Sequence, residues 1–125
     1  MLKKNILPLA VVYSIALAIL CLISFSKFPK IKVSNADKIF HSSAYIVLAG
    51  IWYYAFFYHF KKGQKASIIN SVFLSFTFGM IIEVLQEVFT TTRQADILDV
   101  LANTLGIMVF VVFILIKNRI TVKKL

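Results

Sequence analysis

Three short clusters of polar residues stand out in a sequence that is otherwise strongly apolar. They occupy positions 37–45, 83–86 and 93–103. Each cluster contains residues spaced by three or four, which share a helix face: 37, 41 and 45 in the first, 83 and 86 in the second, and 96, 99 and 103 in the third. The clustered residues are, in chain order, Asp37, Lys38, His41, Tyr45, Glu83, Gln86, Arg93, Asp96, Asp99 and Asn103.

These residue types could serve three kinds of chemistry. Lys38 and Arg93 could pair with the phosphate of a lipid head group while acids and amides orient it. The imidazole and carboxylates could coordinate a divalent metal, or they could act as general acid and base. The candidate metal ligands are His41, Glu83, Asp96 and Asp99. No recognised metal, nucleophile or phosphate-loop motif is present, so the sequence identifies no cofactor and no catalytic residue, and it leaves open whether the protein is an enzyme.

Several of these residues also have a purely structural interpretation. Asp96 and Asp99 fit the N-cap and first turn of a helix, where acids favour the helix dipole. Glu83 could form a structural ion pair with Arg93, and Asn103 could hydrogen-bond a neighbouring helix. Glu87 and His59 are expected at the membrane interface, outside the cluster.

Four apolar runs must position these residues. The chain has 125 residues, is 60% hydrophobic and 15% charged, and has a mean hydropathy of +0.87. A soluble domain is about 25% charged. The runs cover about 6–25, 39–60, 67–89 and 97–116, and each is long enough for a bilayer, which needs about 20 residues. The sequence therefore predicts a single all-α domain over 1–125, a bundle of four transmembrane helices.

The basic residues predict how the bundle is oriented. Nine of the 14 Lys and Arg residues fall on the side that holds both termini and the middle loop, and five fall on the other side. By the positive-inside rule both termini are cytoplasmic, as expected of a multi-pass protein of the cytoplasmic membrane. With no soluble domain to carry a basic face, the net charge of +9 does not indicate nucleic-acid binding.

This topology brings the three clusters together at the outward-facing end. Every acid in the chain lies at or near that end, namely Asp37, Glu83, Glu87, Asp96 and Asp99. Small residues at spacings of four predict the contact faces: Ser71, Ser75 and Gly79 in one run, and Ala102 and Gly106 in another. Glu83 continues the first of these stripes, so it should point into the bundle. Carboxylates inside a membrane helix usually pair or face a cavity, and they are functional candidates.

The ordered set of motifs resembles the VanZ-like family of small bacterial membrane proteins. The matching pieces are Asp37-Lys38-x-x-His41-x-x-x-Tyr45, Gly79-x-x-x-Glu83-x-x-Gln86 and Arg93-x-x-Asp96-x-x-Asp99-x-x-x-Asn103-x-x-Gly106. The family takes its name from a member associated with resistance to the glycopeptide antibiotic teicoplanin. The resemblance implies a cell-envelope role. It also supports eight of these residues as members of one polar site: Asp37, His41, Glu83, Gln86, Arg93, Asp96, Asp99 and Asn103.

Three functions remain open at this point. The first is an envelope protein whose polar pocket binds a membrane-lipid head group or a lipid-linked cell-wall precursor. The second is a membrane-embedded enzyme, with or without a metal, that acts on an envelope lipid. The third is a small transporter or accessory subunit, which would have to oligomerise because four helices without an internal repeat give little room for a transport path. The sequence does not determine the oligomeric state.

Overall fold

The computed structural model describes the backbone of residues 2–27, 34–89 and 97–124, and the side chains of residues 4–22, 38–88 and 97–120. Throughout these ranges the chain is helical apart from one short turn. The elements are α1 (Leu2–Lys27), α2 (Ser34–Tyr54), the π-helical turn η1 (Ala55–His59), α3 (Gln64–Phe89) and α4 (Ile97–Lys124).

Four helices are long and apolar enough to cross a membrane, which confirms the predicted all-α membrane bundle. The apolar stretches cover Lys4–Leu22, Lys38–His59, Gln64–Val88 and Ile97–Ile120. Most helices extend a few residues beyond the apolar runs, because a helix can continue where its backbone and side chains reach water. The protein is therefore a multi-pass membrane protein.

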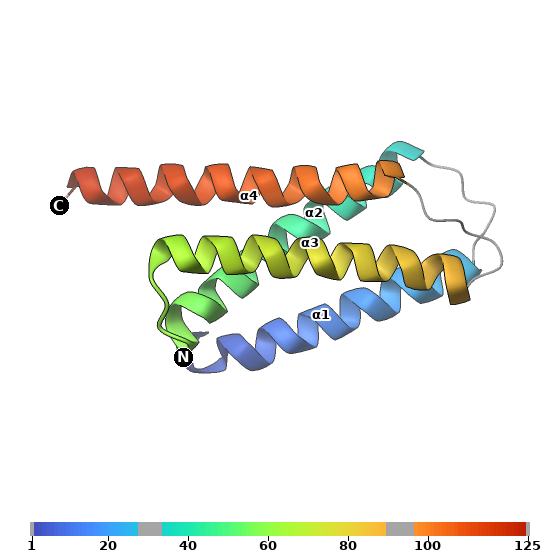
Figure 1. Ribbon diagram of the computed structural model, residues 1–125, viewed down its shortest axis with the longest axis horizontal. Helices are drawn as coiled ribbons and strands as arrows, with labels where there is room; N and C mark the ends of the chain where they lie inside the picture. The colour runs from blue at the N-terminus through green and yellow to red at the C-terminus, as the bar shows by residue number, and fades with distance from the viewer. Residues whose placement is uncertain (1, 28–33, 90–96, 125) are drawn as a thin grey trace.

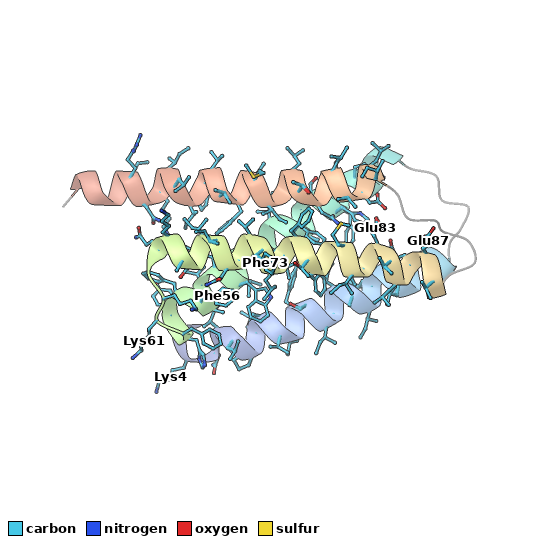
Figure 2. The ribbon with its side chains drawn as sticks, in the orientation of Figure 1. Lys4, Phe56, Lys61, Phe73, Glu83 and Glu87 are labelled. Carbon is cyan, nitrogen blue, oxygen red and sulfur yellow. The ribbon has the colours of Figure 1, made fainter. Side chains whose placement is uncertain are left out.

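The helices run up and down, and the two ends of the bundle differ in charge. The start of α1, the α2–α3 turn and the end of α4 lie toward one end, whereas α2 begins and α3 ends near the other (Figure 1). Figure 2 shows Lys4 and Lys61 at the first end, and Glu83 and Glu87 toward the second. We call the second end the polar end.

Helix α2 packs against α1, α3 and α4, and its most extensive contact is with α4. Its closest approach is to α4, where a Cβ added to Gly106 would lie 2.2 Å from the backbone oxygen of Ser42. The Ser42 hydroxyl donates to the carbonyl of Ala102 across the same contact, at 2.9 Å. The predicted role of Ala102 and Gly106 as a contact face is thus confirmed, because only small residues allow two backbones to come this close.

The small-residue face of α3 is buried, also as predicted. Ser67, Ser71 and Ser75 are fully inaccessible, while Phe73 on the opposite face is 72% exposed. On α1, Ser14 donates to the carbonyl of Ala10 and accepts from the Trp52 indole at 2.9 Å. These contacts satisfy polar groups at membrane depth, where water is not available to do so.

A π-helical turn ends the α2 segment, and nothing in the sequence predicted it. The amide of Phe60 donates to the carbonyl of Ala55 at 3.2 Å, and that of Lys62 donates to Phe56 at 3.0 Å. Lys61 adopts a left-handed backbone conformation with φ of 55°. Such a residue commonly stops a helix. The chain can therefore reverse within a few residues and start α3 at Gln64.

Candidate functional site: a buried polar core

Seven of the ten clustered residues have described side chains, and they gather inside the bundle at the polar end. We call these seven the polar core: Lys38, His41, Tyr45, Glu83, Gln86, Asp99 and Asn103. All but Lys38 are at most 4% exposed, although they come from three different helices. The Asp37 side chain, Arg93 and Asp96 lie outside the described residues.

Lys38 and Asp99 form an ion pair between the N-terminal parts of α2 and α4. The Asp99 side chain is fully buried, whereas the Lys38 side chain is 26% exposed, so the pair links a buried acid to a partly exposed lysine. The second Asp99 oxygen, Oδ2, lies 3.9 Å from His41 Nε2. Asp99 therefore does more than cap α4, because its carboxylate faces two side chains of α2.

Tyr45 and Asn103 meet where α3 carries Gly79. A Cβ on Gly79 would lie 3.1 Å from Asn103 Nδ2 and 3.4 Å from the Tyr45 hydroxyl oxygen. The missing side chain thus makes the space that these two polar groups occupy. Within the described part of the structure the Tyr45 hydroxyl, Asn103 Oδ1 and Ser75 Oγ have no hydrogen-bond partner. Buried polar groups are rarely left so in folded proteins, where another group or a water molecule usually satisfies them.

Glu83 and Gln86 bring α3 into the same core. Glu83 is 3% exposed and Gln86 is fully buried. Gln86 Nε2 donates to the backbone carbonyl of Cys21 at 3.1 Å, which ties α3 to the end of α1. Two residues predicted to lie outside the site do so, since Glu87 and His59 are both exposed.

Two interpretations raised by the sequence, a metal site and a Glu83–Arg93 ion pair, can be compared with the described side chains. In the part of the chain with described side chains, no three His, Cys, Asp or Glu residues are close enough to hold a metal ion. His41, Glu83 and Asp99 do not form such a set, and Asp96, the fourth candidate, lies outside the described part. The predicted Glu83–Arg93 pair involves a residue outside that part as well.

Three contributors were missed by reasoning from the sequence. The Ser42 hydroxyl holds α4 beside His41, and Ser75 adds a buried hydroxyl one turn below Gly79. The spacing of four did place Ser75 on the buried stripe of Gly79 and Glu83, but only as a contact residue and not as part of the site. The carbonyl of Cys21 is a backbone group, so no residue type could reveal it.

The arrangement combines one partly exposed cation with buried carboxylates, amides and hydroxyls. An ammonium can pair with an anionic group that arrives from the surface, and the buried acceptors and donors can hydrogen-bond its polar substituents. The His41–Asp99 contact provides the elements of an acid–base pair.

Comparison with known proteins identifies the family of the chain. No curated protein and no solved structure matches the chain. The model of one family, VanZ/LLP1, matches residues 4–118 and so includes all four membrane helices and the whole polar core. The chain, with its four membrane helices, is thus a member of the VanZ/LLP1 family.

Proposed function

We propose that the polar core binds the phosphate-bearing head group of an envelope lipid or of a lipid-linked cell-wall precursor, from the outer side of the cytoplasmic membrane. The observation that carries this proposal is the Lys38–Asp99 pair. Its acid is fully buried, and the lysine that carries its cation is partly exposed at one end of a membrane bundle. Intramembrane ionisable residues of this kind commonly mark binding sites.

The charged and the neutral residues of the polar core would contact different parts of a head group. Asp99 holds the Lys38 ammonium near the N-terminus of α2, where an anionic phosphate can approach it. Below the ammonium, Tyr45 and Asn103 offer a hydroxyl and an amide. Such groups hydrogen-bond uncharged substituents such as sugar hydroxyls or amides. A head group with both phosphate and neutral polar groups would use the whole core.

Lipid binding can be tested by native mass spectrometry of the purified full chain. The probes are phosphatidylglycerol, which is anionic, and phosphatidylcholine, which carries no net charge. We expect the wild-type protein to prefer phosphatidylglycerol and Lys38→Met to lose that preference. Lys62→Met serves as the matched control, because Lys62 is an exposed lysine beyond the opposite end of α2. An unchanged preference in Lys38→Met would contradict the proposal.

Family membership suggests a cellular readout for the same site. If the core binds a cell-wall precursor, expression of the wild-type chain should change susceptibility to teicoplanin, and Lys38→Met should not. An equal change in susceptibility with both proteins would show that the effect on teicoplanin does not depend on Lys38 of the polar core.

The His41–Asp99 contact favours a second candidate, an enzyme that acts on an envelope lipid. The two side chains lie 3.9 Å apart in a site shielded from bulk water. This function predicts lipid turnover by the reconstituted protein that His41→Ala and Asp99→Ala both abolish. Metal analysis of the same preparations would show whether a metal takes part. Wild-type protein that binds lipid without converting it would exclude this candidate.

A further inference from the structure

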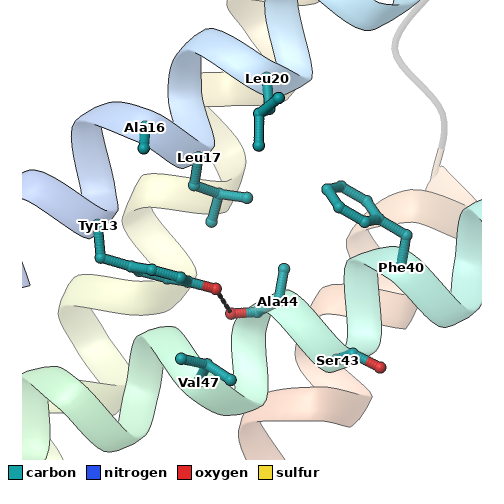
Figure 3. A pocket seen from close by; sticks show the side chains of 8 residues that line it. All are labelled: Tyr13, Ala16, Leu17, Leu20, Phe40, Ser43, Ala44 and Val47. Atoms are coloured by element: carbon teal, nitrogen blue, oxygen red, sulfur yellow. Dashed lines mark hydrogen bonds between the residues drawn. The ribbon is translucent and has the colours of Figure 1, made fainter.

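A groove between α1 and α2 lies on the membrane-facing side of the bundle, next to the polar core. Its volume is about 310 Å³, which is at the lower end of the range for ligand pockets. Figure 3 shows the side chains of α1 and α2 that face each other across it. The lining residues are Tyr13, Ala16, Leu17, Leu20, Phe40, Ser43, Ala44 and Val47.

The groove offers almost nothing but hydrocarbon to an occupant. The one phenol in its lining is already used, because the Tyr13 hydroxyl donates to the carbonyl of Ala44 at 2.8 Å (Figure 3). Ala16 and Ser43 are small and exposed, so they leave the groove open toward the lipid. Both walls belong to stretches that cross the membrane. A hydrocarbon chain therefore matches the lining, and a soluble polar ligand does not.

Both walls of the groove are continuous with the polar core. On α2, Phe40 lines the groove while its ring contacts the His41 imidazole edge-to-face, with centroids 5.7 Å apart. On α1, Leu20 lines the groove, and the next residue, Cys21, accepts the hydrogen bond from Gln86. The groove thus starts at the level of His41 and Gln86 and runs toward the middle of the membrane.

We propose that this groove seats a hydrocarbon chain of the same lipid whose head group the polar core holds. The inference rests on the proposed function and adds the class of ligand: an amphiphile with an anionic head and at least one long chain. The polar core would then recognise the head group. The groove would hold one hydrocarbon chain of the same lipid on a surface that is already formed before the lipid binds.

The test compares two probes that share a head group but differ in chain length. Purified full-length protein is mixed with dioleoyl phosphatidylglycerol or with dihexanoyl phosphatidylglycerol, and bound lipid is measured by native mass spectrometry. We expect the long-chain probe to bind about ten-fold more tightly than the short one. Ala16→Phe should fill the groove, abolish this difference and leave binding of the short probe unchanged.

Val12→Phe is the matched control, because Val12 lies one turn away on α1, is 63% exposed and does not line the groove. Ser43→Phe fills the groove from the other wall and replaces Ala16→Phe if that variant does not fold. Equal binding of both probes to the wild-type protein, or a groove variant that behaves like Val12→Phe, would overturn the inference. Failure of both probes to bind would instead contradict the proposed function.

Discussion

At the scale of single residues, the Lys38–Asp99 pair determines how the polar core tolerates change. Asp99 is fully buried, so removal of Lys38 takes away the ammonium that contacts its carboxylate in a low-dielectric site. His41 Nε2 lies 3.9 Å from the same carboxylate. Removing one partner of a buried pair usually costs more stability than replacing both partners by apolar residues.

Lys38→Met should therefore lower the free energy of unfolding in detergent by about 3 kcal/mol. The double variant Lys38→Met with Asp99→Leu should recover most of this loss, because both charges of the ion pair are then replaced by apolar side chains. Thermal unfolding of the single and double variants measures the effect. A double variant as unstable as the sum of its single changes would show that the two residues are not coupled.

Gly106 provides a second residue-scale prediction. Its added Cβ would meet the Ser42 backbone oxygen at 2.2 Å, so Gly106→Ala should push α2 and α4 apart and cost about 1–3 kcal/mol. Gly50→Ala is the control, because its Cβ would meet only the Phe110 ring, at 3.4 Å. It should be neutral or stabilising, since alanine is the better helix former. Equal melting temperatures for the two variants would argue against the close α2–α4 contact.

At the scale of elements, periodicity predicted the buried faces but not the pairing of side chains across them. The spacing of four was enough to place Ser71, Ser75 and Glu83 on the inner face of α3, because helix geometry alone sets that relation. The partner of each charge could not be predicted, because it depends on the rotation and offset of packed helices. Lys38 of α2 reaches Asp99 of α4 by virtue of that offset.

The inner face of α3 leads to a prediction for the whole helix. Ser71→Leu should destabilise the bundle, since Ser71 is fully buried and a larger side chain has no room. Phe73→Leu, two residues away, should change stability by less than about 0.5 kcal/mol because its side chain faces lipid. Thermal unfolding of both variants in the same detergent measures the two effects. A larger loss of stability for Phe73→Leu than for Ser71→Leu would show that α3 is rotated relative to this structure.

At the scale of the whole molecule, hydropathy was sufficient to predict four membrane helices. The prediction of which end of the bundle faces the cytoplasm rests instead on the distribution of Lys and Arg. The predicted orientation can be tested by thiol labelling of intact cells in a Cys21→Ser background. A membrane-impermeant reagent should label Glu87→Cys, and should label Gly63→Cys only after the cells are lysed. Labelling of Gly63→Cys in intact cells would invert the assignment and place the polar core on the cytoplasmic side.

The π-helical turn Ala55–His59 has a consequence for how the chain can change length. A π turn holds one residue more than the α turn it replaces, so deletion of a single residue here would restore α geometry. The turn lies at the far end of α2 from Lys38 and His41. A one-residue deletion within it would therefore be absorbed where α2 gives way to α3, and the spacing of the polar core along α2 would be preserved. The chain can therefore lose one residue at this junction without moving the polar core.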